Sequence, residues 1–308
     1  MQKLSYIFIV LIAVLYFGCE KEKNIQLPTA SPMFTVFSIQ PQNSFLTAQI
    51  GRTRSLSEPL NLYNDSNTFR LNYAIVQVFS NNTLVDTLKF NPSTALYTST
   101  KTRLIADRTY KLVIAANGFS TAETEAVALR QTPITRLRKL PSNRVTSSGE
   151  PFDEIEITFR DTEARKNYYR VIVNFPMYMY NEVCVSSSDA DLIQFESTDP
   201  FEGTNGEICY DSRYLLFTDD NFNLSTKTLR LFVERYRLRT DIGANGKVIR
   251  PSVELQNISK SYFDYLKSKI NYNNSSDNPF VEPSNVLSNV KKGFGIFAPF
   301  GQSIDTIR

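Results

Sequence analysis

Apolar residues alternate with polar ones in short runs through most of this chain, and this two-residue period restricts the chain to a mostly β fold. The runs NYAIVQVF (72–79) and EIEITF (154–159) each place aliphatic side chains on one face. Because successive side chains of a strand point to opposite faces, such runs predict strands with one buried face. Short turns such as Asn117-Gly118 separate the runs, which is typical of β-sandwiches.

The order of these runs predicts two β-rich domains, a β-sandwich at 33–135 and a second domain at 152–308. Within the first, TYKLVIAANGFSTAETEAV (109–127) resembles surface-protein sandwiches similar to the carboxypeptidase regulatory domain. That resemblance implies an Ig-like or carboxypeptidase-regulatory-like sandwich. Residues 136–151 are expected to form a connector. The basic residues in and just before it form either a basic groove or, as we expect, a solvated interdomain strand; they are Arg130, Arg136, Arg138, Lys139 and Arg144.

One helix is predicted near the C-terminus, over residues 258–271. The stretch ISKSYFDYLKSKI places apolar residues at Ile258, Tyr262, Leu266 and Ile270, which is the spacing of one helical face. Ser259 is the expected N-cap, because its side-chain oxygen can accept a hydrogen bond from a first-turn N–H. We expect the helix to pack along the edge of a sheet or barrel.

The N-terminus reads as a secretory signal that ends at a cysteine. Lys3 precedes an uncharged apolar run at 6–17, which is shorter than the roughly 20 residues of a membrane-spanning helix. Gly18 and Cys19 then resemble the bacterial lipobox, in which the cysteine becomes the acylated first residue of the mature chain. This resemblance implies a signal peptide at 1–18 and a lipidated tether at 19–32. The alternative is an ordinary signal peptide with an incidental cysteine.

The polar stretch after Cys19 bears on location. Glu20 and Glu22 resemble the acidic export signals of Bacteroidota lipoproteins, which implies display on the cell surface; the alternative is that any solvated tether is charged. No later stretch has the length of a spanning helix, so we expect a globular body held at the outer membrane by its acyl anchor.

Composition excludes several kinds of chemistry. The sequence has no histidine, and histidine is the usual general base and zinc ligand. Removal of Lys3 with the signal peptide leaves 33 of the 34 Lys and Arg residues against 31 Asp and Glu, so the charge gives no argument for a nucleic-acid partner. We expect no cofactor, no metal and no enzymatic activity, although chemistry based on carboxylates or Ser–Lys pairs remains open.

Two cysteines, Cys184 and Cys209, remain after lipidation. In an oxidising compartment an even pair predicts a disulfide. The alternative is two buried free thiols, since cysteine packs well as a small hydrophobe.

Three short motifs that suggest chemistry have simpler explanations. GFGIFA (293–298) has the glycines of a dinucleotide loop but no strand–turn–helix unit around it. DDNFNL (219–224) begins like a calcium loop, but Leu224 stands where glycine is required, so a hairpin turn is expected. Glu154 and Glu156 share a strand face, which we interpret as solvated rather than as a glycosidase pair.

Two surface features are candidate contacts for a partner or ligand. Tyr178 and Tyr180 lie in FPMYMYNEV, which predicts either an exposed aromatic patch or a strand buried on both faces. A strand predicted at 228–239 carries Arg235, Arg237 and Arg239 on one face, presenting a basic end to solvent. Aromatic and Arg residues are frequent anchors of interfaces, but ordinary packing or solvation explains them equally.

The most specific stretch is DNPFVEPSNVLSNVKKGFGIF (277–297). Together with the helix YFDYLKSK (262–269) and the strand start at 167–170, it resembles a Bacteroidota lipoprotein family, domain of unknown function 4249, that accompanies TonB-dependent outer-membrane receptors. The prolines and glycines of 278–300 are those of a packed closing segment, so none of its residues is expected to be catalytic.

The resemblance implies a non-enzymatic accessory or ligand-capturing subunit of a TonB-dependent uptake system, with a β-barrel receptor as its partner. An adhesive or structural surface lipoprotein without a barrel partner is the first alternative. A carboxylate-based surface hydrolase is the second.

Overall fold

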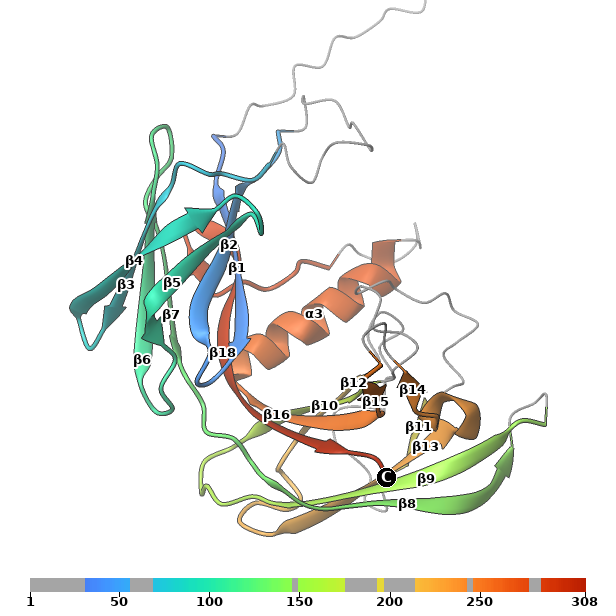
Figure 1. Ribbon diagram of the computed structural model, residues 1–308. Coiled ribbons are helices and arrows are strands. Elements are labelled where there is room, and N and C mark those ends of the chain that lie inside the picture. Colours follow the sequence, from blue (N-terminus) through green and yellow to red (C-terminus); the bar gives the residue numbers. More distant parts are fainter. Residues whose placement is uncertain are drawn as a thin grey trace, which may run out of the picture.

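The computed structural model describes residues 31–55, 69–145, 149–174, 193–196, 214–242, 246–276 and 284–308. Figure 1 shows a mostly β molecule built in two halves, with one long α-helix packed between them. The predicted fold class is therefore confirmed. One curled sheet of twelve strands runs through both halves, in the order β12-β10-β16-β18-β1-β2-β5-β4-β3-β6-β7-β17.

The first half is a curled sheet around its own core. Its strands are β1 (Phe34–Pro41), β2 (Phe45–Arg52), β3 (Ile75–Ser80), β4 (Thr83–Asn91), β5 (Leu96–Arg103), β6 (Thr109–Ala115) and β7 (Ala122–Val127). Alternate side chains such as Val76 and Val78 of β3 point inward and are fully buried. The apolar alternation in the sequence thus selects the inner face of this sheet.

The second half is a sandwich of two sheets. Its elements are β8 (Ile134–Val145), β9 (Pro151–Arg160), β10 (Tyr168–Asn174), β11 (Ile193–Glu196), β12 (Tyr214–Thr218), β13 (Thr226–Glu234), η3 (Arg235–Leu238), β14 (Asp241–Ile242), β15 (Val248–Ile249), β16 (Ser252–Ile258) and α3 (Lys260–Ser276). The sheet β11-β13-β9-β8 packs on β10, β12 and β16 through a core that includes Ile157, Phe159, Tyr169 and Leu231.

Helix α3 covers the other face of this layer. Tyr262, Phe263, Leu266 and Ile270 pack on Ile296 and its neighbours. The Ser259 hydroxyl accepts a hydrogen bond from the Tyr262 N–H at 3.2 Å, so the expected N-cap is confirmed. The helix begins two residues later and ends five residues later than the predicted 258–271.

The C-terminal strand belongs to both halves. After β17 (Val290–Lys291), the long strand β18 (Gly293–Thr306) pairs in parallel with β1 from Gly293 to Phe300. It then pairs with β16 from Gly301 to Thr306. Because β17 pairs with β7 while β18 pairs with β1, the closing segment contacts both outer strands of the first half, β1 and β7.

This arrangement changes the predicted domain plan. The closing segment 278–300, expected within the second domain, supplies strands to the first half. Residues 136–151, expected to be a connector, form most of β8 and the start of β9, which pair with each other. An edge strand that is exposed along most of its length carries little apolar alternation, so the sequence of β8 resembles a solvated linker.

Candidate functional site at the junction of the two halves

A hollow of about 440 Å³ lies where the two halves meet, and we call it the junction notch. The ends of β6 and β7, the β9–β10 connection and the start of α3 form its walls. The lining residues are Thr109, Glu125, Ala126, Val127, Leu129, Arg165, Lys166, Asn167, Tyr168, Asn257, Ile258, Ser259, Lys260 and Ser261.

The cationic side chains of the junction notch are each held by a neighbouring carboxylate. Lys166 Nζ lies 2.7 Å from Asp220 Oδ1, and Lys260 Nζ lies 2.5 Å from Asp264 Oδ2. The hydrogen bond that Lys166 donates to Asp220 raises the pKa of Lys166, and the bond that Lys260 donates to Asp264 raises the pKa of Lys260. Both amines therefore stay charged at neutral pH and are unsuited to act as bases or nucleophiles.

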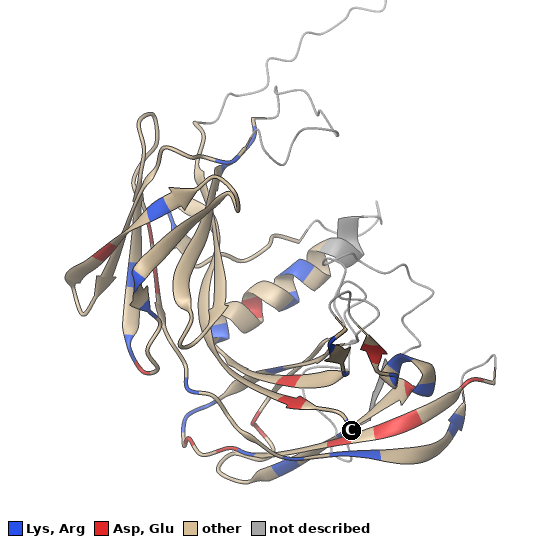
Figure 2. Ribbon diagram, in the orientation of Figure 1, with Lys and Arg blue, Asp and Glu red and all other residues tan. Residues whose placement is uncertain are grey.

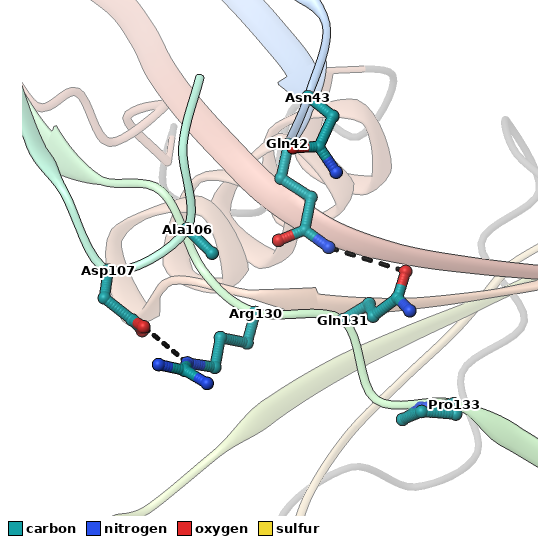
Figure 3. Close-up of a pocket in the computed structure, with 7 residues that line it drawn as sticks. All are labelled: Gln42, Asn43, Ala106, Asp107, Arg130, Gln131 and Pro133. Carbon is teal, nitrogen blue, oxygen red and sulfur yellow. Dashed lines mark hydrogen bonds and ion pairs between the residues drawn. The ribbon is translucent and has the colours of Figure 1, made fainter. Parts of the chain in front are cut away.

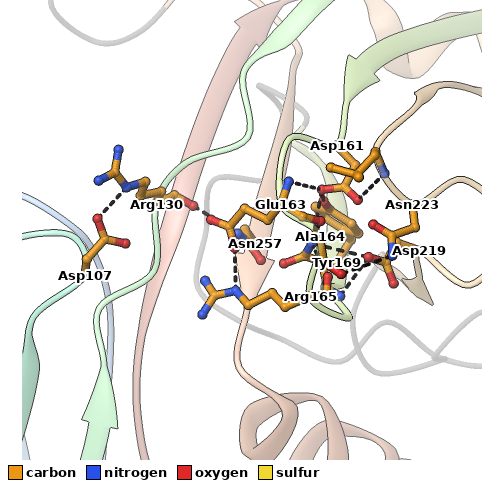
Figure 4. Close-up of polar contacts among 12 residues, drawn as sticks. Asp107, Arg130, Asp161, Glu163, Ala164, Arg165, Tyr169, Asp219, Asn223 and Asn257 are labelled. Carbon is orange, nitrogen blue, oxygen red and sulfur yellow. Dashed lines mark hydrogen bonds and ion pairs between the residues drawn. The ribbon is translucent and has the colours of Figure 1, made fainter.

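A buried polar network adjoins the notch through Asn167, which lines it, and Figure 4 shows the polar contacts of this network. Asp161 and Asp219 are each 1% exposed, and Asn167, which lies between them, is 3% exposed. The Asn167 backbone N–H donates to Asp219 Oδ2 at 2.9 Å, and its side-chain amide donates to Asp161 Oδ1 at 3.1 Å. Asp161 also accepts bonds from the Tyr169 hydroxyl and the Leu224 N–H.

The electrostatics of this network are those of a structural element. Burial raises the pKa of Asp219, and the Asp161 carboxylate adds to the rise. Burial and the same carboxylate raise the pKa of the Tyr169 hydroxyl. The network ties the β9–β10 connection to the β12–β13 connection. Residues 219–224 form a turn, as expected, but the expected hairpin is wrong. Strand β12 pairs with β10 and β13 pairs with β9 and β11, so this turn crosses between the two sheets. Both aspartates are enclosed, and their hydrogen bonds hold the two connections together.

A second, shallower hollow of about 520 Å³, the crossover groove, lies on the crossover from β7 to β8 (Figure 3). Amide side chains of Gln42, Asn43 and Gln131 line it, with an ion pair between Arg130 and Asp107. The Arg130 carbonyl accepts a bond from Asn257 Nδ2 at 3.1 Å. This contact joins the crossover to the second half, between a residue that lines each hollow.

The predicted row of three arginines is wrong. Strand β13 ends at Glu234, and the chain continues as the 3₁₀-helix η3. Arg237 is therefore buried, at 4% exposure, with its Nε 3.3 Å from Glu234 Oε2. Arg235 is tied to Asp153 at 2.9 Å, and Arg239 is exposed beyond the helix. The three-residue turn of a 3₁₀-helix disperses side chains that a strand would align.

Glu154 and Glu156 lie on β9, but their face is not a simple solvated one. Glu156 is 8% exposed and pairs with Arg138 of β8 and Arg230 of β13. Glu154 also lies 3.4 Å from Arg230. Long basic side chains on the flanking strands cover both carboxylates, an arrangement that period-two patterning alone does not reveal.

The other predicted site residues lie outside the described residues. These are Cys19, Tyr178, Tyr180, Cys184 and Cys209. Lipidation, the disulfide and the aromatic contact therefore stay predictions. Over the described ranges, no group of three or more His, Cys, Asp or Glu residues is placed to hold a metal ion, and no helix has the length and apolarity to cross a membrane.

The residues of the junction notch carry no recognisable pattern in the sequence. They come from four separated stretches near 109, 125–129, 165–168 and 257–261, and no spacing motif links them. The available signal was the pair of segments at 167–170 and 262–269, which the family resemblance had singled out. In the structure these two segments meet, because Arg170 donates to the Tyr262 hydroxyl at 3.1 Å.

A family model described as Domain of unknown function (DUF4249) matches residues 43–303. The chain belongs to this family. The match spans both halves and includes the shared strand up to Ser303. DUF4249 membership thus confirms the family predicted from the closing segment, and it assigns no activity.

No curated protein matches this chain. Among solved structures it is similar to "a beta-glucuronidase from glycoside hydrolase family 2", with 11% identity and a TM-score of 0.22 over 75% of this chain and 19% of the other. It is also similar to a "Biofilm associated protein - BSP domain", with 8% identity and a TM-score of 0.20 over 77% and 58%. At these TM-scores neither likeness assigns a fold or a function. The chain spans less than two thirds of either structure.

Proposed function

We propose that this DUF4249 chain is a lipid-anchored, non-enzymatic binding protein at the surface of the outer membrane. In this proposal Cys19 carries the anchor, and the protein serves as the accessory or ligand-capturing subunit of a TonB-dependent uptake system. The N-terminal signal and the family resemblance support the location and the partner. The junction notch supports the proposed binding of a ligand.

The observation that carries the binding proposal is that both lysines of the notch are paired with carboxylates. Lys166 and Lys260 are held as cations by adjacent carboxylates, so they can hold a ligand but cannot abstract its protons. Glu125 faces the same hollow, which gives it both donors and acceptors. A concave site with convergent polar groups and an aromatic wall at Tyr168 is suited to holding a small polar ligand.

Adhesion without a barrel partner is the second candidate, because the same anchor and fold would serve it. A carboxylate hydrolase is less well supported. Asp161 and Asp219 are enclosed in a structural network, and Glu154 and Glu156 are covered by arginines.

The partnership is tested by purifying the tagged full-length protein from its native host in a gentle detergent. A TonB-dependent barrel should be recovered in near-equal amount, and Cys19→Ser should leave the outer-membrane fraction and lose the barrel. Recovery of the lipoprotein alone, with unaltered growth of the deletion strain on every nutrient tested, would favour adhesion.

The notch is tested separately in the same strain. The double variant Lys166→Ala/Lys260→Ala should reproduce the growth defect of the deletion while still recovering the barrel. Lys89→Ala/Lys101→Ala, which removes two exposed lysines of the first half, is the matched control. Equal growth of both double variants would remove the notch from the proposal.

A further inference from the structure

Strand β8 forms one edge of the four-stranded sheet β11-β13-β9-β8. It is twelve residues long, ITRLRKLPSNRV, and no residue of it is buried. Figure 1 shows it along the end of the second half that is remote from the start of β1. Within the described chain its outer side has no paired strand, so it presents unpaired backbone N–H and C=O groups.

Pairing along β8 is regular only in its middle. The register with β9 shifts between Ile134 and Arg136 and again between Pro141 and Val145. The stretch 136–140 between these irregularities is about 17 Å long at the usual rise of a strand. In an antiparallel pair alternate residues direct their N–H and C=O groups away from the partner, so this stretch can accept a short additional strand. We call it the β8 edge.

The β8 edge is basic. Strand β8 contains Arg136, Arg138, Lys139 and Arg144 and no acidic residue, and Figure 2 shows this basic strand beside the acidic residues of β9. Arg138 is paired with Glu156, and the Arg144 guanidinium lies 4.1 Å from the Phe232 ring centroid. Arg136 and Lys139 are exposed and have no carboxylate partner among the described residues. Their charge is therefore available to a partner.

The core of the second half is only partly covered at the β8 edge. Leu137 and Ile134 are only partly buried where they pack against the core of the second half. A strand added beside β8 would place alternate side chains over Leu137 and the others beside Arg136 and Arg138. The side chains that fit are apolar on the first face and acidic on the second.

From the free edge, its charge and this half-covered core border, we propose that the β8 edge binds an extended acidic segment of another protein by strand addition. Backbone hydrogen bonds supply the affinity, and Arg136 selects for acidic residues on its own face of the added strand. Lys139 lies on the Leu137 face and adds positive charge at the border of that face. Strand β1 begins at Phe34, which pairs with Gly293 in the first half, and β18 runs from there into the second half. The β8 edge lies at the end of the second half that is remote from the start of β1, where the proposed tether would join (Figure 1). This position favours a protein partner over the bilayer. The inference stands whether or not the partner is a TonB-dependent barrel.

Lys139 and Pro141 could instead serve to prevent strand pairing, as lysine and proline do on many edge strands. Binding of a designed peptide distinguishes this role from strand addition. The purified full-length protein is titrated with a fluorescent peptide of alternating Glu and Val. We expect saturable binding that weakens as salt is raised. We also expect slowed amide hydrogen exchange within 136–140, which a purely electrostatic contact would not produce.

Arg136→Glu/Lys139→Glu should weaken binding of this peptide at least about tenfold and favour a peptide of alternating Lys and Val. Both side chains are exposed, so the fold should be retained, as far-UV circular dichroism can verify. Lys89→Glu/Lys101→Glu, the same charge change on the first half, should bind like the parent. The proposal is overturned by no saturable binding, by binding without exchange protection, or by equal weakening in both double variants.

Discussion

At the scale of single residues, Gly295 shows how closely the shared strand approaches β1. Its φ is +114°, and a Cβ at this position would clash with the Val36 carbonyl oxygen. Glycine is needed both for the backbone conformation and for the approach. The resemblance to a dinucleotide loop around this position is therefore a consequence of strand packing.

Gly295→Ala should destabilise the protein by about 3 kcal/mol or more, because backbone strain adds to the displacement of β1. Gly118→Ala is the control, since Gly118 also has a positive φ but no atom lies within 4 Å of its built Cβ. Strain alone should cost it about 1–2 kcal/mol. Urea unfolding measures both, and equal losses would contradict the close approach.

Asp219 should give the protein a distinctive pH dependence. Its pKa in the folded state is raised above the ordinary value of 3.8, so the folded protein binds more protons in this window than the unfolded one. Its contribution to stability is fully present below pH 3.8 and is lost as pH rises through the folded pKa. The unfolding free energy of the parent minus that of Asp219→Asn should therefore fall as pH rises above about 4.

The neighbouring Asp220 provides a control of opposite sign. The hydrogen bond from Lys166 lowers the pKa of Asp220, so its contribution is present above the unfolded pKa and is lost as pH falls through the folded pKa. Urea unfolding of both Asn variants across a pH series measures the two slopes. The same slope for Asp219→Asn and Asp220→Asn would refute the burial argument.

At the scale of elements, the sequence signals that predict helix α3 agree with its tertiary packing. Ser259 caps its first turn, and the apolar positions predicted from helical spacing are the ones that contact the sheet. The strand predicted at 228–239 shows the opposite case, because η3 replaces its last part. There, Arg235 pairs with Asp153 and Arg237 with Glu234.

Ser259→Ala should reduce the unfolding free energy by about 1 kcal/mol through loss of the cap. Ser261→Ala lies two residues further on and removes only a hydroxyl contact with Ser259, so it should cost less than about 0.5 kcal/mol. Urea unfolding of the two variants makes the comparison. A larger loss at Ser261 would show that the cap does not stabilise α3.

At the scale of the whole molecule, the shared strand makes the two halves depend on each other. β18 supplies Phe297 to the core of the first half, and Ile307, the residue directly after this strand, belongs to the core of the second. The Gln42 N–H also donates to the Phe300 carbonyl at 2.8 Å across the junction. Neither half is a closed unit without this strand, so we expect them to unfold together.

Native-state hydrogen exchange tests this coupling with the Gly295→Ala variant. The opening free energy of the slowest amides should fall by the same amount in β1 and in β13, although β13 does not contact residue 295 through any strand pairing. A fall confined to the first half would mean that the halves unfold independently.

The sequence by itself determined the mostly β class, the single helix with its cap, the turn at 219–224 and the family. These features depend on local periodicity and on residues close together in the chain. Tertiary structure decided the strand character of 136–145, the end of β13 at Glu234, the sharing of β18 and the position of the junction notch. Each of these depends on contacts between distant segments, such as Asn257 with Arg130 or β1 with β18. Local pattern carries no information on which distant strand becomes the partner, because any strand edge offers the same backbone groups.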